Sequence, residues 1–218
     1  MNLRIFDALP DLAAAAARTI EQRIATIERP VIAISGGGTP QPMYEIFREA
    51  PPTKPVTWVL VDERYVPPGD PQSNSRMIRE KLQPADFLHF DTELQDPQKT
   101  VAAFEKEWHS RAIKRLDIIV LGIGDDGHTA SLFPGTAVLD LMEGVAAAVF
   151  VPRLDQWRVT LTLPVIRAAA LRLVLVSGES KARIVRDARE GVDHPIVRAT
   201  SGVETWWLVD KAAARNIE

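Results

Sequence analysis

The chain has 218 residues, 46% of them hydrophobic and 25% charged, which is the composition of a globular protein and excludes a disordered one. A net charge of −3 and a pI near 5.9 exclude the broad positive field that non-specific binding to nucleic acid or to an anionic membrane requires. The absence of cysteine excludes disulfides, cysteine-ligated zinc and thiol catalysis.

The N-terminal region lacks the pattern of a targeting segment. Its only candidate is the alanine run at residues 13–17, which follows the acidic residues Asp7 and Asp11 instead of a positive segment. No run reaches the roughly 18 apolar residues of a membrane span. We therefore expect a cytoplasmic protein without a membrane anchor, and the sequence leaves its oligomeric state open.

Helical and extended patterns alternate along the chain. Leu12, Ala16, Ile20 and Ile24 recur at helical spacing, with Asp11 placed to cap the helix start. Further helices are predicted at residues 40–50, 74–82 and 97–115. Another follows the predicted strand at residues 171–176 and ends near residue 189. Apolar runs predict strands at residues 31–34, 56–61, 118–121, 145–151, 159–163, 171–176 and 205–209.

Continuous apolar strands joined by helical crossovers are typical of a mainly parallel sheet. We therefore predict a single doubly wound α/β domain over residues 1–218, with helices on both faces of the sheet. Functional sites in such folds lie at the carboxyl ends of the strands. The polar segments that follow three of the predicted strands are the candidates.

The first candidate is the glycine turn after the strand at residues 31–34. Its glycines allow backbone amides to approach a ligand closely, Thr39 is placed to cap the next helix, and Pro40 suits the first helical position. A helix start of this kind favours phosphate. The alternative is an ordinary tight turn, and the turn alone does not decide between them. The candidate phosphate-binding residues are Gly36, Gly37, Gly38 and Thr39.

The second candidate is the charged triplet Asp62, Glu63 and Arg64, which directly follows a buried strand. These charges would face the cleft, although a surface ion pair explains the triplet equally well. Ser73 precedes a predicted helix and is expected to cap it.

The third candidate spans residues 122–135, which follow the strand at residues 118–121 and contain three glycines before His128. Asp125 or Asp126 could orient the imidazole, whose pKa suits proton transfer near neutrality. A lone histidine more often has a structural role, but this context favours catalysis. The other histidines lack such a setting. No metal-ligand spacing and no Gly-x-Ser-x-Gly motif is present, so we expect no metal site and no serine triad.

Two cationic residues could complete an anion site. Arg158 begins the predicted strand at residues 159–163, and Lys181 lies near the start of a helix. Arginine binds phosphate with two parallel hydrogen bonds, whereas lysine supplies a point charge. The alternative for both is an exposed surface cation.

Four ordered motifs together resemble the 6-phosphogluconolactonase family: Ser-Gly-Gly-x-Thr-Pro at residues 35–40, Asp-Glu-Arg-x-Val-Pro at 62–67, Ser-Asn at 73–74, and Gly-x-Gly-x-Asp-Gly-His-Thr-Ala-Ser-Leu-Phe-Pro-Gly at 122–135. The resemblance implies hydrolysis of 6-phospho-D-glucono-1,5-lactone in the oxidative pentose phosphate pathway, without a cofactor. Its partner is then a small phosphorylated sugar lactone.

When the roles of the family's motif residues are transferred to this chain, His128 is the base, and Asp62 and Asp126 shape the catalytic end. The residues that would hold the phosphate and sugar are Gly36, Gly37, Gly38, Thr39, Arg64, Arg158 and Lys181. Two departures stand out: Gly38 replaces a serine common in the family, and residues 155–157 replace its proline-rich approach to Arg158.

Two rival functions remain. Glucosamine-6-phosphate deaminases resemble this layout but carry an acidic residue five positions after the histidine, where this chain has Phe133. A phenyl ring cannot relay a proton, so deamination is disfavoured. A non-catalytic sugar-phosphate sensor of a transcription regulator would need a DNA-binding segment, and no basic helix-turn-helix candidate is present.

Overall fold

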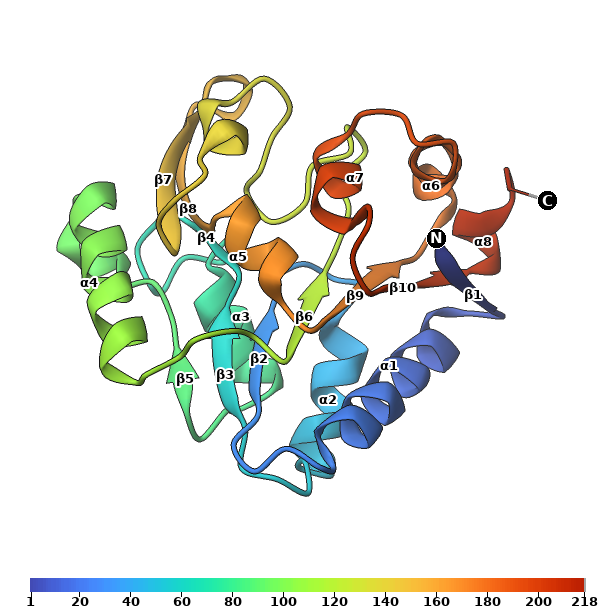
Figure 1. The fold of residues 1–218 in the computed structure, drawn as a ribbon, viewed down its shortest axis with the longest axis horizontal. Coiled ribbons are helices and arrows are strands. Elements are labelled where there is room, and N and C mark those ends of the chain that lie inside the picture. The colour runs from blue at the N-terminus through green and yellow to red at the C-terminus, as the bar shows by residue number, and fades with distance from the viewer. Residues whose placement is uncertain (218) are drawn as a thin grey trace.

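The computed structural model describes residues 1–217, and its centre is a seven-stranded sheet in which all neighbouring strands run parallel (Figure 1). The strand order is β1-β10-β9-β6-β2-β3-β5. This confirms the predicted α/β class with a mainly parallel sheet. The strands are β1 (Asn2–Phe6), β2 (Val31–Ile34), β3 (Thr57–Leu60), β5 (Phe87–Leu88), β6 (Ile118–Leu121), β9 (Leu171–Val176) and β10 (Thr205–Asp210).

Helices cover both faces of this sheet because the chain winds in two directions. From β1 through β2 and β3 to β5 it moves one way along the sheet, and from β6 through β9 to β10 it moves the other way. Right-handed crossovers place the helices of the two halves on opposite faces. The first half contains α1 (Leu9–Ile24), α2 (Gln41–Glu49) and α3 (Asn74–Lys81). The second contains α5 (Leu163–Ala168), α6 (Ala182–Arg189) and α7 (Pro195–Thr200), with α4 (Pro97–Ser110) leading into β6 and α8 (Lys211–Ala214) after β10.

The winding reverses between β2 and β6, which are hydrogen-bonded neighbours with Ile32 opposite Ile118. The loops that follow these two strands therefore leave the sheet in opposite directions and open a crevice at their carboxyl ends. Two of the predicted candidate segments, the glycine turn and residues 122–135, are these loops. The fold brings them together although more than 80 residues separate Ser35 from Gly122.

A second sheet is antiparallel and has the order β4-β8-β7. Its strands are β4 (Asp62–Arg64), β7 (Ala146–Val151) and β8 (Gln156–Leu161). The prediction that the strands at residues 145–151 and 159–163 join the parallel sheet is therefore wrong. Only residues 152–155 connect β7 to β8, which suffices for an antiparallel hairpin but not for a parallel crossover.

Several elements differ from their predicted limits. β1, β4, β5, α5, α7 and α8 were not predicted, and α1 begins at Leu9 after the N-cap residue Ala8. Asp11 consequently lies in the first turn and does not cap it. The predicted helix at residues 97–115 ends at Ser110, because Ala112 adopts a left-handed conformation with φ of 55°.

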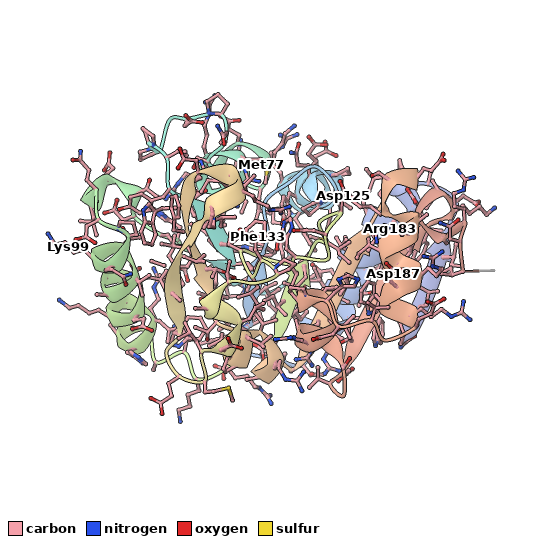
Figure 2. All side chains as sticks on the ribbon, turned by 90° about the horizontal axis from the view of Figure 1, so that it is seen from above. Met77, Lys99, Asp125, Phe133, Arg183 and Asp187 are labelled. Atoms are coloured by element: carbon pink, nitrogen blue, oxygen red, sulfur yellow. The ribbon has the colours of Figure 1, made fainter. Side chains whose placement is uncertain are left out.

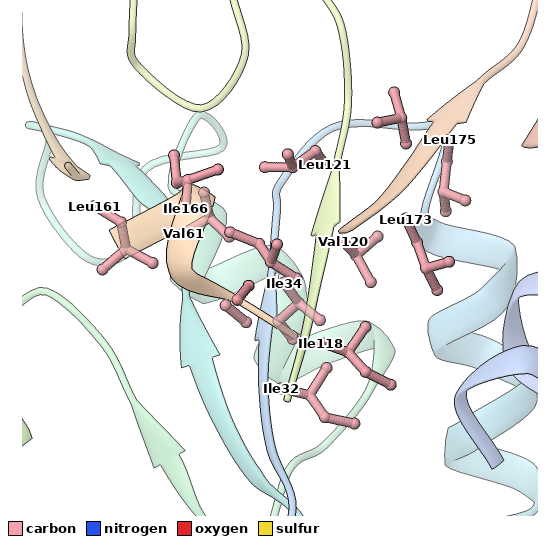
Figure 3. Packing of buried hydrophobic residues seen from close by; sticks show 14 of the residues in the cluster. Ile32, Ile34, Val61, Ile118, Val120, Leu121, Leu161, Ile166, Leu173 and Leu175 are labelled. Carbon is pink, nitrogen blue, oxygen red and sulfur yellow. The ribbon is translucent and has the colours of Figure 1, made fainter. Parts of the chain in front are cut away.

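The core lies between the central sheet and its helices. Figure 3 shows Ile32, Ile118 and Leu173 from the neighbouring strands β2, β6 and β9, all fully buried. Val159 and Leu161 of the second sheet belong to the same hydrophobic cluster, so the two sheets share one core. Within residues 1–217, no helix combines the length and apolar character needed to cross a membrane.

Candidate active site

A cavity of about 390 Å³ opens at the crevice between the loops after β2 and β6. All predicted site residues except Asp126 line it, namely Gly36, Gly37, Gly38, Thr39, Asp62, Arg64, His128, Arg158 and Lys181. A larger cavity of about 540 Å³ lies at the amino end of β10. Its lining contains no histidine and a single arginine, so the smaller cavity is the better candidate for chemistry.

The glycine turn after β2 is held from two sides. The Ser35 hydroxyl donates to the Val120 carbonyl at 2.8 Å, and the Tyr44 hydroxyl donates to the Ser35 carbonyl at 2.6 Å. A side chain at Gly36 would collide with Asn74, whose Oδ1 lies 1.8 Å from an ideal Cβ position. Within residues 1–217, the amides of residues 37–39 donate to no protein acceptor, so they are free donors in a turn that lines the cavity.

The start of α2 differs from the prediction. Pro40 is the N-cap residue, no side chain caps the helix, and the first helical residue is Gln41. The predictions that Thr39 caps this helix and that Pro40 is its first residue are therefore wrong. The feature that supports anion binding at this turn is therefore its free amides.

The charged triplet after β3 has divided roles. Glu63, only 1% exposed, accepts hydrogen bonds from the amides of Arg64, Asn74 and Ser75 and from the Ser73 hydroxyl. Burial raises the pKa of this carboxyl, against the effect of those four donors. Glu63 thus joins β4 to the start of α3. Ser73 is the N-cap residue of α3, as predicted.

Asp62 and Arg64 flank Glu63 and line the cavity. The Asp62 carboxylate accepts from the Ser131 hydroxyl at 2.7 Å, and its backbone carbonyl accepts from the Asn74 side chain at 2.8 Å. Ser131 belongs to the loop after β6. The Asp62 contact therefore ties the second sheet to the loop that carries His128.

His128 contacts Asp126, and not Asp125. Its Nδ1 lies 2.5 Å from Asp126 Oδ1, which also accepts from the His128 amide at 3.2 Å. The Gly124 amide donates to the His128 carbonyl at 2.8 Å, which closes the loop behind the ring. Nδ1 is therefore occupied by the carboxylate, and His128 itself lines the cavity.

Burial lowers the pKa of His128, while Asp126 and then Asp62 act in the opposite direction. For Asp126, burial alone would raise the pKa, but the hydrogen bond and charge of His128 bring it below its usual value. The Phe133 ring stacks on the imidazole with centroids 4.2 Å apart. Near neutral pH, an imidazole with a lowered pKa is mostly in the neutral form that accepts a proton.

Arg64 and Arg158 lie directly opposite each other in the β4–β8 pair. Arg64 donates to the Gln72 carbonyl at 2.7 Å, but within residues 1–217 the Nε atoms of both arginines are buried without a partner. Burial and the nearby Arg64 lower the pKa of Arg158, which is only 9% exposed. Like charges directly opposite destabilise a sheet, so a bound anion would relieve both the repulsion and the missing hydrogen bonds.

Lys181 also lines the cavity, but it already has a partner. Its Nζ lies 2.7 Å from Asp125 Oδ1, and Arg183 donates to the Asp125 carbonyl at 3.0 Å. Figure 2 shows Asp125 and Arg183 side by side at the edge of this loop. The structure thus separates the roles of the adjacent aspartates: Asp125 contacts Lys181 and Arg183, which follow β9, and Asp126 contacts His128.

Arg153 is a site residue that the sequence did not reveal. It lies in the 3-10 turn η3 (Pro152–Leu154) between β7 and β8, and its Nη2 is 2.6 Å from Asp126 Oδ2. No local motif marks it, because the contact depends on how the second sheet approaches the loop after β6. No group of three or more acidic, histidine or cysteine residues in the described part of the chain could hold a metal ion.

Comparison with known proteins gives a consistent picture. Residues 7–207 match the family described as glucosamine-6-phosphate isomerases/6-phosphogluconolactonase. A 6-phosphogluconolactonase from Haemophilus influenzae is 35% identical over 202 residues, covering 84% of this chain and 86% of that protein. The solved 6-phosphogluconolactonase of Trypanosoma brucei superposes with a TM-score of 0.86 at 26% identity, covering 100% of this chain and 98% of the other.

A monomeric glucosamine-6-phosphate deaminase has nearly the same fold. It superposes with a TM-score of 0.85 at 22% identity, covering 99% of this chain and 100% of the other. At this identity the likeness concerns the fold alone. The overall architecture therefore does not separate lactone hydrolysis from deamination, and the side chains in the cavity must do so.

Proposed function

The chain belongs to the glucosamine-6-phosphate isomerase/6-phosphogluconolactonase family, and we propose that it hydrolyses 6-phospho-D-glucono-1,5-lactone to 6-phosphogluconate. The observation that carries this proposal is the presence in one cavity of a partly buried, carboxylate-bound histidine and two arginines without anionic partners. The first suits the activation of water, and the second suits a phosphate. A phosphorylated lactone needs both.

In this reaction His128 is the general base. Its Nε2 removes a proton from water, whose oxygen attacks the lactone carbonyl carbon, and Asp126 stabilises the imidazolium through Nδ1. Backbone amides hold the oxyanion of the tetrahedral intermediate. The bond between the carbonyl carbon and the ring oxygen then breaks, and the imidazolium returns its proton to that oxygen.

Other residues of the same cavity hold the phosphate. Arg64 and Arg158 bind its oxygens, supported by Lys181 and by the free amides of the glycine turn. Gly38 offers its amide without the hydroxyl that a serine would add. Asp62 helps to hold the loop of His128 through Ser131.

Phe133 favours hydrolysis over deamination. Deaminases that resemble this chain carry an acidic residue at this position, whereas Phe133 packs flat against His128 and cannot transfer a proton. The ring instead shields one face of the imidazole from water. That burial contributes to the lowered pKa of His128, which suits a base near neutral pH.

The test is continuous acid release from freshly prepared 6-phosphogluconolactone, corrected for spontaneous hydrolysis and compared with unphosphorylated gluconolactone. We expect strong preference for the phosphorylated lactone, and a loss of about 10²- to 10⁴-fold in kcat for His128→Asn. Equal rates on both lactones would refute the phosphate site. Ammonia release from glucosamine 6-phosphate would favour the deaminase reaction instead.

A further inference from the structure

Four side chains form a closed ring of contacts at the proposed base. Arg153 Nη2 lies 2.6 Å from Asp126 Oδ2, and Asp126 Oδ1 lies 2.5 Å from His128 Nδ1. The His128 ring stacks on Phe133, and the Arg153 guanidinium lies over the same phenyl ring, 4.9 Å from its centroid. Arg153 thus contacts both neighbours of His128, although it does not line the cavity.

The ring joins two separate parts of the fold. Asp126, His128 and Phe133 come from the loop after β6, whereas Arg153 comes from the hairpin of the second sheet. Asp155, with φ of 46°, donates its amide to the Pro152 carbonyl and fixes the turn that presents Arg153. The contact is therefore built by a defined backbone turn and not by a mobile chain end.

We propose that Arg153 is a positioning residue for the reaction proposed above: by holding Oδ2 of Asp126, it keeps Oδ1 on Nδ1 of His128. Asp126 needs such a restraint, because its short side chain is partly exposed and could otherwise rotate toward solvent. The guanidinium plane also packs on Phe133, which limits the positions that Arg153 itself can take.

The charge and the geometry of Arg153 act on the pKa of His128 in opposite directions: the contact of Asp126 with Nδ1, which Arg153 holds, raises this pKa, whereas the charge of Arg153 lowers it. His128 faces the carboxylates of Asp126 from its own loop and Asp62 from β4, and the other charged groups on its cavity are Arg64, Arg158 and Lys181. His194 packs against the loop at Gly127. Arg153 opposes the two carboxylates and contributes to the lowered pKa of His128, after burial. Without Arg153, loss of its charge alone would raise the pKa of His128, whereas loss of the Asp126 contact, the larger of the two effects, would lower it.

The experiment compares Arg153→Gln with the unaltered protein by two measurements. The first is the pH profile of kcat/KM for the phosphorylated lactone. The second is NMR titration of the His128 ring without substrate, its signal identified by its loss in His128→Asn. Because the Arg153 side chain is 53% exposed, solvent screens its charge, and we expect the loss of the Asp126 contact to dominate and both midpoints to fall.

Two variants serve as controls. Arg153→Lys keeps the charge and should restore most of the midpoint but not the packing on Phe133. Arg23→Gln removes an exposed ion pair with Glu204, remote from the cavity and similar in exposure, and should leave both midpoints unchanged. Higher salt should screen the opposing charge effect and leave the effect of the lost Asp126 contact in Arg153→Gln.

The outcomes separate this inference from the proposed function. A His128 midpoint that is unchanged or raised in Arg153→Gln, or an equal fall in kcat/KM at every pH, would overturn the positioning role. The proposed function would instead fail if the unaltered protein turned over no lactone. In that case a lowered NMR midpoint would still support the link from Arg153 through Asp126 to His128.

Discussion

The two sides of the cavity differ in how completely the protein satisfies its own polar groups. On the histidine side, both oxygens of Asp126 are used, one by His128 and one by Arg153. On the cation side, Arg64 and Arg158 lie opposite each other with buried Nε atoms that have no partner within residues 1–217. Asp126 is thus satisfied without a ligand, whereas the two arginines keep donors that a bound anion could satisfy.

This contrast suits the two tasks. A general base must hold its geometry before the substrate arrives, because reorganisation during the reaction would raise the barrier. A binding site can leave its cations unsatisfied, because the free energy lost in the empty state is recovered when phosphate binds. The histidine side should therefore be sensitive to small displacements, and the cation side to the loss of charge.

The largest expected effect comes from disturbing the histidine side with Gly124→Ala. A Cβ at this position would lie 2.0 Å from His128 Nδ1 and 2.1 Å from Cε1, so the methyl group must displace the imidazole. A displacement near 1 Å can reduce the rate by about 10²-fold. We expect that loss in kcat, measured by acid release, with little change in Tm because the backbone accepts alanine here.

Gly69→Ala is the matched control, since an added Cβ there meets no atom within 4 Å. It should leave kcat and Tm unchanged. If Gly124→Ala retained full activity, the imidazole would have to tolerate displacement, and the idea of a rigid histidine side would be wrong. A large fall in Tm would point to general damage instead.

The second prediction concerns the cation side. Arg158→Met removes a buried cation that faces Arg64, so the empty protein should become more stable by on the order of 1 kcal/mol. The same change should raise KM for the phosphorylated lactone by roughly tenfold or more. It should also reduce the rise in Tm that inorganic phosphate produces in the unaltered protein. Thermal unfolding with and without phosphate measures the stability and the Tm response, and acid release measures KM.

Arg172→Met provides the opposite case. Arg172 is also buried, at 2% exposed, but its guanidinium donates to the carbonyls of Ile166, Arg167, Ala169 and Glu204. Its loss leaves these acceptors unpaired, so Tm should fall strongly while the response to phosphate persists. A fall in Tm for Arg158→Met as well would show that both arginines are structural.

The sequence predicted much of this site because its main parts are local. The loop at residues 122–135 contains the histidine and Asp126, and the strand before it fixes where the loop begins. The parallel sheet, predicted from its apolar runs, then brings this loop to the glycine turn. What the sequence left open was which aspartate holds His128, because Asp125 and Asp126 are adjacent and only the fold assigns one to Lys181.

The second sheet is the part that sequence reasoning placed wrongly. β7 and β8 were expected in the parallel sheet because their apolar runs resemble buried strands, although β7 exposes Phe150 between the buried Val149 and Val151. The short connection was the signal for a hairpin. Arg153 could not be inferred from either feature, since its contact with Asp126 depends on how the two sheets are packed.

The smallest expected effect concerns Lys181, which belongs to both sides of the comparison. It lines the cavity like the arginines but is paired with Asp125 of the histidine loop. Asp125 is 73% exposed, so the pair is largely screened by solvent and contributes little to stability. Lys181→Met should therefore raise KM by about fivefold or less, with kcat unchanged.

Asp125→Asn tests the same pair from its other end. It frees Lys181 from its carboxylate, while the Arg183 hydrogen bond to the Asp125 carbonyl still anchors the loop. KM for the phosphorylated lactone should then fall, and it should do so most at low salt, where a freed cation attracts phosphate most strongly. If Lys181→Met instead raised KM as much as Arg158→Met does, Lys181 would belong with the unsatisfied cations, and its contact with Asp125 would be released whenever substrate binds.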